Sequence, residues 1–203
     1  YGFSCIVARR PFVSVPVGFR AEPPTAATDA PGAPIWVPID HLLLQAVSVN
    51  RGAVFAKGGD GMAVVFGRAG DAIAAAVAAQ RAFEIEPWPT ALRVRMGVHT
   101  GEAEERGGDY FGPAVNRAAR LMSEAMGGQV FVSLSTAEVV RDRLPEGLTL
   151  VELGERNLRS VTRPERVFEL IWSAGREPLP ERSPPPPVGT QTRSDLIGRD
   201  AEL

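Results

Sequence analysis

The spacing of apolar and polar residues changes several times along the middle of the chain. From residue 41 to 49 the apolar side chains suit one face of a helix, and residues 71–83 are rich in alanine and free of proline. Residues 92–98 alternate apolar with polar side chains, as a half-buried strand does. Pro113 can occupy the first turn of a helix that runs to about Met126. The pattern therefore predicts three helices and a strand between the second and third of them.

Shorter segments complete the predicted fold. Gly58-Gly-Asp-Gly61 indicates a tight hairpin turn between two β-prone runs. Ser135, with Glu138 three residues later, is a plausible N-cap for a helix to about Arg143. Helices thus alternate with strands, which predicts an α+β fold: a ferredoxin-like mixed sheet with helices packed on it. The remaining predicted strands are residues 53–55, 62–66, 129–132, 148–153 and 166–172.

Proline is concentrated at the two ends of the chain. Residues 1–40 hold seven of the 18 prolines, and residues 178–187 hold six. Because proline lacks a backbone donor and fixes φ, we expect an irregular N-terminal segment over 1–39 and a proline-rich linker from 173 onward. Residues 40–172 are then the folded domain.

Composition excludes several classes of protein. Acidic residues number 24 and basic residues 22, so no strong positive field favours direct nucleic-acid binding. Cys5 is the only cysteine, which excludes a disulfide framework and a cysteine-rich zinc site and indicates a reducing, cytoplasmic compartment. No apolar run approaches the ~20 residues of a membrane helix, so no membrane partner is expected.

Two positions could carry chemistry on their own. Asp60 in the predicted hairpin could ligate Mg²⁺, although aspartate and glycine also fill tight turns for backbone reasons alone. His99 ends the strand that follows, and with no acidic or cysteine partner nearby in the sequence it is interpreted mainly as structural.

A third candidate is the predicted helix that begins at Pro113. Asn116 and Arg120 are four residues apart and so share one helical face. The arginine fork suits phosphate oxygens, but the same spacing also describes an ordinary solvated face. Gly107-Gly108, just before Asp109, indicates a flexible loop that leads into the helix.

Taken together, the order and spacing of these motifs are far more specific than any one of them. They are Gly59-Asp60-Gly61, Arg93-Val-Arg-Met-Gly-Val-His-Thr-Gly101, Asp109-Tyr-Phe-Gly-Pro-Ala-Val-Asn116-Arg-Ala-Ala-Arg120, Gly127-Gly-Gln-Val130 and Arg163-Pro-Glu-Arg-Val-Phe168. Over roughly residues 40–172 the chain resembles the catalytic domain of class III nucleotidyl cyclases. It is most similar to the actinobacterial type that precedes ATPase modules in transcriptional regulators.

The resemblance implies a fold, a reaction and a set of roles. The family has a ferredoxin-like core, works as a dimer with shared sites, and uses two Mg²⁺ or Mn²⁺ ions to convert ATP into cyclic AMP and pyrophosphate. By this resemblance Asp60 matches a metal aspartate and Asp109 a base-recognising position. Asn116 matches the residue that orients the ribose, and Arg120 matches the arginine that stabilises charge on the reacting phosphate.

Two departures from the family pattern affect the expected activity. The family's first metal aspartate lies on an opening strand, and nothing like that strand is found before residue 40, where the acids are Glu22, Asp29 and Asp40. Asp40 better suits the N-cap of the following helix. The lysine that usually recognises adenine aligns with Ala56, one residue before Lys57. A one-residue slip along a strand turns a side chain to the opposite face, so Lys57 is a substrate-binding candidate in place of that lysine only if the hairpin is bulged.

Three functions therefore stay open: a working cyclase, an impaired cyclase-like domain that binds nucleotide or dimerises, and the regulatory arm of a transcriptional regulator. We expect weak or no activity in a homodimer, and a heterodimer with an intact cyclase could still use Asn116 and Arg120. The last nine residues, Asp195-Leu-Ile-Gly-Arg-Asp-Ala-Glu-Leu203, resemble the opening of a STAND-type ATPase module, and no P-loop follows in the chain.

Overall fold

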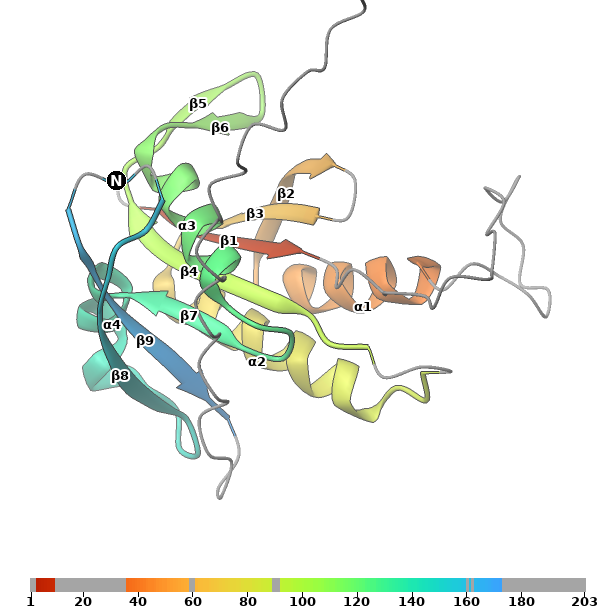
Figure 1. Cartoon of the computed structure of the whole chain (residues 1–203). Coiled ribbons are helices and arrows are strands. Elements are labelled where there is room, and N and C mark those ends of the chain that lie inside the picture. The colour runs from red at the N-terminus through yellow and green to blue at the C-terminus, as the bar shows by residue number, and fades with distance from the viewer. Residues whose placement is uncertain are drawn as a thin grey trace, which may run out of the picture.

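A seven-stranded mixed sheet organises the molecule (Figure 1). The computed structural model describes residues 3–9, 36–58, 61–88, 92–159, 161 and 163–172. Neighbouring strands pair antiparallel, except for the parallel pair at the middle of the sheet, β4–β7. In spatial order the strands are β2 (Gly52–Gly58), β3 (Gly61–Phe66), β1 (Phe3–Arg9), β4 (Arg95–Gly101), β7 (Val130–Ser133), β9 (Glu165–Ile171) and β8 (Thr149–Arg156).

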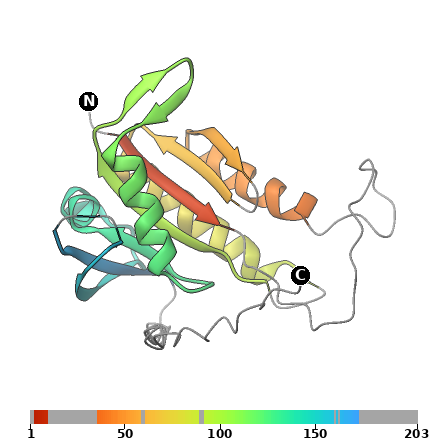
Figure 2. The ribbon, with the colours of Figure 1, turned by 45° about the horizontal axis from the view of Figure 1, so that its top comes forward.

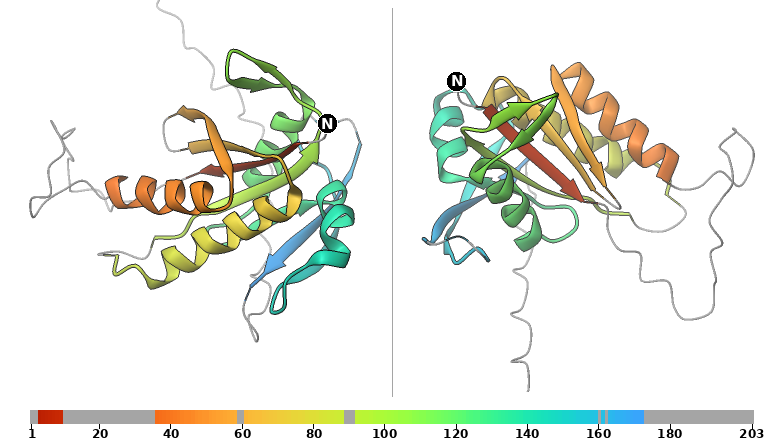
Figure 3. Two further views of the ribbon diagram at one scale, coloured as in Figure 1. Left: turned by 180° about the vertical axis from the view of Figure 1, so that it is seen from behind. Right: turned by 90° about the horizontal axis from the view of Figure 1, so that it is seen from above.

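Helices cover both faces of this sheet unequally. Helices α1 (Trp36–Val49) and α2 (Ala69–Ile85) lie along one face, as the view from behind shows (Figure 3). The short helix α4 (Leu134–Val140), followed by a 3₁₀ turn at Arg141–Arg143, packs near them. Helix α3 (Pro113–Glu124) lies across the opposite face, in front of β1 and β4 (Figure 2). The predicted α+β fold with helices packed on a mixed sheet is confirmed.

The main core lies between the sheet and α1, α2 and α4. Alternate strand residues such as Val64, Met96 and Val98 point into it, as the period of two along a strand requires. Alanine on the buried face of α2 allows the helix to lie close to the sheet. A smaller apolar cluster fills the space beneath α3 and beside β7 and β9; its buried members are Leu121, Ala125, Phe131, Leu158 and Val167.

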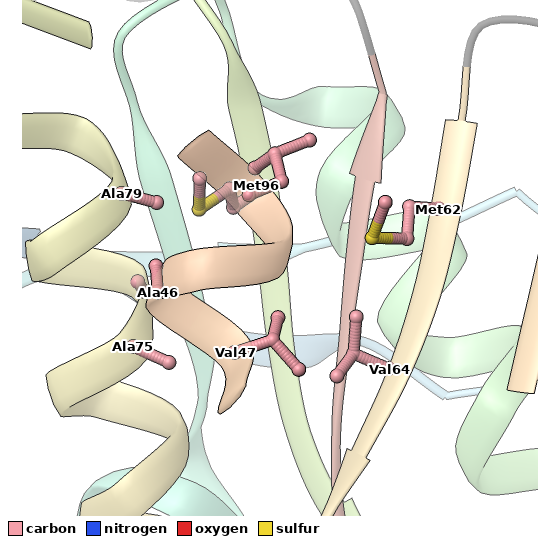
Figure 4. A pocket seen from close by; sticks show the side chains of 9 residues that line it. Ala46, Val47, Met62, Val64, Ala75, Ala79 and Met96 are labelled. Atoms are coloured by element: carbon pink, nitrogen blue, oxygen red, sulfur yellow. The ribbon is translucent and has the colours of Figure 1, made fainter. Parts of the chain in front are cut away.

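A small apolar pocket is lined by residues of the main core (Figure 4). Its volume is about 20 Å³, and every side chain around it is apolar. Ala46 and Val47 come from α1, Ala75 and Ala79 from α2, and Met96 from β4. An apolar space of this size has no polar partners for a water molecule, so its lining simply lacks van der Waals contacts.

Strand β1 is the main departure from the sequence prediction. Residues 1–39 were expected to be irregular, yet Phe3–Arg9 forms a strand between β3 and β4. Its composition supports this placement, because Phe3, Ile6 and Val7 are strong strand formers. The proline content of the following residues concealed a short strand that has no proline of its own. The expected lack of an opening strand is therefore wrong, whereas Glu22 and Asp29 lie outside the described residues.

Two helix starts also differ from prediction. Helix α1 begins at Trp36, so Asp40 lies within the helix and is not its N-cap. Helix α4 begins two residues earlier than predicted, because Ser133, and not Ser135, accepts a hydrogen bond from the backbone N–H of Thr136. Serine is a suitable N-cap at either position, so local sequence did not distinguish the two.

A two-stranded arm, β5 (Glu104–Arg106) and β6 (Asp109–Phe111), projects beyond the sheet (Figure 1). Gly107 and Gly108 were expected to form a flexible loop, but they are the two central residues of its hairpin turn. Their φ values of 62° and 85° are those of a turn with two left-handed residues, which glycine adopts without steric cost.

Some of the sequence predictions concern residues near the C-terminus that lie outside the described residues. The proline-rich linker from residue 173 and the ATPase-like tail lie outside them, so the domain limit at 172 stays a prediction. Among the helices that are described, none is both long and apolar enough to span a membrane.

Candidate functional site

Helix α3 carries two of the candidate residues on its outer face. Gly112, with φ 129°, turns the chain out of the arm, and Pro113 occupies the first turn, where its missing N–H costs nothing. Asn116 is exposed and Arg120 is half-buried. The side of the helix that faces the sheet is apolar and buried, and it comprises Ala114, Ala118, Leu121 and Met122.

Helical geometry explains this division. At about 100° per residue, Asn116 lies opposite the buried row. Arg120 is rotated by roughly 40° from Asn116 around the helix axis and so also lies away from that row. The two side chains therefore point away from the sheet, about one turn apart on the outer side of α3. The prediction that Asn116 and Arg120 share one helical face is confirmed, and their expected roles stay predictions.

An ion pair holds the flank of α3 that faces β9. Arg117 Nε lies 3.4 Å from Glu165 Oε2, and the side chain of Glu165 is only 14% exposed. Burial raises the pKa of the Glu165 carboxyl, and the nearby charge of Arg117 opposes that shift. Arg117 thus links the first half of α3 to β9 immediately beside Asn116.

The arm places Asp109 close to the edge strand β2. The Tyr110 ring meets the Phe55 ring edge to face, with centroids 5.3 Å apart. Asp109 is half-buried, and its Oδ1 accepts a hydrogen bond from the backbone N–H of Tyr110 at 2.8 Å. The arm therefore brings Asp109 to the β2 side of the sheet, and the chain then passes directly into α3.

Lys57 lies on β2, but the strand register turns it away from α3. A bulge between Val54 and Ala56 shifts the pairing, after which Ala56 pairs with Ala63 and Lys57 with Met62. Residues directly opposite each other share one face of a sheet. Met62 is buried in the main core, so Lys57 is exposed at the rim of the α1–α2 face, and Ala56 is on the α3 face. The bulge precedes both residues and does not bring Lys57 to the position that the family lysine would occupy.

His99 lies buried beneath α3, with 3% of its surface exposed. Its Nδ1 is 2.9 Å from Ser133 Oγ and 3.3 Å from Ser135 Oγ. Burial, assisted by the charge of Arg117, lowers the pKa of His99 to about 4. The imidazole is therefore neutral at physiological pH, as a structural histidine would be.

The described residues do not fit a two-metal site. Asp60 lies outside them, while Gly58 and Gly61 on either side pair as the predicted hairpin requires. Strand β1 contains no aspartate or glutamate and ends at Arg9, which pairs with Gly61 on one side and Arg95 on the other. Within the described part of the chain no three His, Cys, Asp or Glu side chains are close enough to hold a metal ion.

Sequence reasoning missed β1 and the contacts that fix α3. Arg9 stands opposite the residue that follows Asp60, and only the strand register shows this. The Arg117–Glu165 pair joins residues 48 positions apart, so no local pattern could have indicated it. The apolar run within Phe3–Arg9 was the one available signal for the strand.

Comparison with known proteins agrees with this fold and these motifs. Residues 71–170 match the family described as the adenylate and guanylate cyclase catalytic domain. The crystal structure of an adenylate/guanylate cyclase/hydrolase from Silicibacter pomeroyi superposes with a TM-score of 0.63 at 25% identity, covering 86% of this chain and 98% of that one. The folded part of this chain is a class III nucleotidyl cyclase domain.

Relatives of this cyclase domain are found in several organisms. An uncharacterized protein of Mycobacterium tuberculosis is 37% identical over 171 residues, which are 81% of this chain and 58% of that protein. A Rhizobium meliloti protein named adenylate cyclase 3 is 33% identical over 154 residues, 72% of this chain and 26% of its own length. The chain thus spans little more than half of the mycobacterial relative.

A further structural neighbour shows the same fold with nucleotide. It is the guanylate cyclase domain of RhGC from Catenaria anguillulae in complex with GTP, with a TM-score of 0.62 at 14% identity, covering 85% of this chain and 97% of that one. At this identity the likeness concerns the fold of the cyclase domain alone.

Proposed function

We propose that this cyclase domain binds a nucleoside triphosphate, ATP by preference, and has weak or no cyclase activity as a homodimer. The observation that carries the proposal is the composition of β1, a central strand that contains no carboxylate and ends at Arg9 opposite Gly61. In the same domain, α3 keeps Asn116 and Arg120 on its outer face. One half of the expected chemistry is thus retained and the other half is missing.

The loss of a metal carboxylate affects the reaction at its most charged stage. In the family reaction the ribose O3′ bonds to the α-phosphorus, the bond from that phosphorus to the bridging oxygen breaks, and pyrophosphate leaves while the hydroxyl proton passes to solvent. Removing one electrostatic stabiliser of such a transition state typically costs on the order of 100-fold in turnover.

The retained residues suit a contribution to a shared site. We propose that Asn116 orients the ribose, that Arg120 binds the reacting phosphate, and that Asp109 faces the base. Asp60, if it holds a metal at all, does so without a second carboxylate from β1, and Lys57 has no direct part in base recognition. An intact cyclase partner would supply both aspartates, so a heterodimer would contain one complete site for the synthesis of a cyclic nucleotide signal.

The decisive experiment mixes this chain with an intact class III cyclase in which the arginine equivalent to Arg120 has been replaced by alanine. Cyclic AMP formation from ATP with Mg²⁺ or Mn²⁺ is expected to rise in the mixture, because this chain supplies the missing arginine. The Arg120→Ala variant should give no rise. Arg143→Ala is the matched control, since Arg143 is exposed on the 3₁₀ turn after α4, and it should complement as the wild type does. No gain over the partner alone would count against the heterodimer.

A second function is favoured by the position of Lys57. Strand β1 has no aspartate, and Lys57 of β2 does not lie on the α3 face. The domain could therefore serve as a nucleotide-binding or dimerising module of a transcriptional regulator without turnover. The cyclic AMP assay of the mixtures, combined with calorimetric titration of the purified chain with ATP, distinguishes the two functions. Binding with no cyclic AMP in any mixture would favour the regulatory module.

A further inference from the structure

The imidazole of His99 fills the space between the end of β7 and the first turn of α3. On one side, its Nδ1 meets the hydroxyl of Ser133, the last residue of β7, at 2.9 Å. On the other side, a methyl group placed on Gly101 would lie 2.9 Å from His99 Nε2 and 3.0 Å from the Ala114 Cβ. His99 Nε2 and the Ala114 Cβ therefore both border Gly101, which places the Nε2 edge of the ring near the first turn of α3.

The hydrogen bonds around the ring determine which nitrogen carries the proton. Ser135 Oγ donates its hydroxyl proton to the Thr100 carbonyl oxygen at 2.8 Å. Toward Ser133 Oγ, 3.0 Å away, Ser135 can then only accept, so the Ser133 hydroxyl proton lies between these two oxygens. Thr136 Oγ1, 3.2 Å from Ser133 Oγ, is a second hydroxyl partner for that proton. Whether Ser133 donates to Ser135 or to Thr136, it then accepts from His99, and Nδ1 is the donor.

In the opposite tautomer, with the proton on Nε2, the short contact between Ser133 and Ser135 would lack a hydrogen bond. If Nδ1 were the acceptor, Ser133 would donate to it, and the 3.0 Å contact between Ser133 and Ser135 would join two oxygens with no hydrogen between them. The Nδ1–H form gives an unbroken chain of donors from His99 through Ser133 and Ser135 to the Thr100 carbonyl. The lone pair of Nε2 then faces α3.

This arrangement fixes α3 close to its candidate site residues. Ala114 and the ring edge both border Gly101, and Arg117, about one turn further on, is paired with Glu165 of β9. Asn116 lies between these two anchored residues. A shift of the ring would thus change the direction of the Asn116 side chain and, through the helix, that of Arg120.

We propose that His99 is a positioning residue: its neutral, Nδ1-protonated ring joins β7 to the first turn of α3 and sets the direction of Asn116 and Arg120. The effect on ligand binding rests on the proposed nucleotide-binding function, whereas the tautomer and the position of α3 do not depend on it.

The test combines nitrogen NMR with ATP titration of the full chain. The ¹⁵N shifts of labelled histidine should show His99 protonated at Nδ1 at neutral pH. His99→Leu keeps much of the volume but lacks the donor, and it should shift the backbone amides of residues 114–120 and weaken ATP binding up to about tenfold, the effect of one lost hydrogen bond. His99→Gln offers an N–H and should restore most of both. His41→Leu is the matched control, since His41 is exposed on α1 and is the only other histidine.

Each result decides a separate point. An Nε2-protonated ring, or a folded His99→Leu variant with unchanged amide shifts and ATP affinity, would overturn the inference. If the wild-type chain does not bind ATP, the proposed function fails, and the ¹⁵N shifts and the amides of α3 still decide the role of His99.

Discussion

Gly97 in β4 lies directly beneath Met122 of α3: a methyl group placed on Gly97 would overlap the backbone nitrogen of Met122 and the carbonyl oxygen of Ala118. The helix backbone therefore rests on the strand with no side chain between them. This close approach sets the height of α3 above the sheet, and so the height at which Asn116 and Arg120 stand.

Gly97→Ala is expected to destabilise the domain by about 2 kcal/mol or more, because the added methyl meets backbone atoms that can move only with the whole helix. Gly70→Ala is the opposite case. Gly70 is exposed in the first turn of α2 with open space around its Cα, so alanine there should stabilise by roughly 0.5–1 kcal/mol. Urea unfolding of the two variants measures both changes. Equal effects of the two alanines would show that α3 does not rest on Gly97.

The elements that could be predicted are those with a strong period or clear end signals. Residues 71–83 and the helix from Pro113 have such signals, and α2 and α3 contain them. The arm was missed because its strands are three residues long, too short for any alternation to appear. Strand β1 was missed because proline-rich sequence follows it, although pairing on both sides stabilises a strand whatever lies beyond its end.

The candidate site could be predicted in part for the same reason. Asn116 and Arg120 share a helical face by spacing alone, so their exposure followed from the sequence. The face of the sheet on which Lys57 lies could be determined only from the strand register, because it depends on where the bulge lies in β2. The pairing of Arg9 with Gly61, and of Arg117 with Glu165, depends on tertiary contacts that no local pattern contains.

Filling the small apolar pocket should stabilise the domain. Val47→Ile adds one methylene to a residue of α1 that lines the space of about 20 Å³ (Figure 4), and about 0.5–1 kcal/mol of added stability is expected. Val139→Ile is the matched control, because Val139 on α4 is 59% exposed and the same methylene there stays in water. Thermal unfolding compares the two. A destabilised Val47→Ile variant would show that the space cannot accept a methylene without strain.

The carboxyl of Glu165 is expected to give the domain an unusual pH dependence. Because burial raises its pKa in the folded state, the folded chain holds this proton more tightly than the unfolded chain does. Its contribution to stability is therefore largest in acid and declines as the pH rises from about 4.5 through the raised pKa. Glu165→Gln should remove this decline and change stability at pH 7 by no more than about 1 kcal/mol, the usual range of partly exposed ion pairs. Urea titrations between pH 4 and 8 measure it, and a variant whose profile parallels the wild type would contradict the assignment.

His99 should change the pH dependence of stability in the opposite sense to Glu165, over an overlapping pH range. Its pKa of about 4 in the folded state lies below the ordinary value of 6.5, so the unfolded chain takes up the proton first. The stability that the neutral ring provides is complete above pH 6.5 and is lost as the pH falls toward 4, by up to about 3 kcal/mol.

Comparing variants separates His99 from Glu165. The difference in unfolding free energy between wild type and His99→Gln should shrink steadily from pH 7 to pH 4, because glutamine has no proton to take up. Replacing the exposed His41 by glutamine should leave the acid profile of the wild type in place. If the wild-type and His99→Gln curves stay parallel over this range, the ring is not held neutral by burial, and the loss of stability in acid must come from other groups.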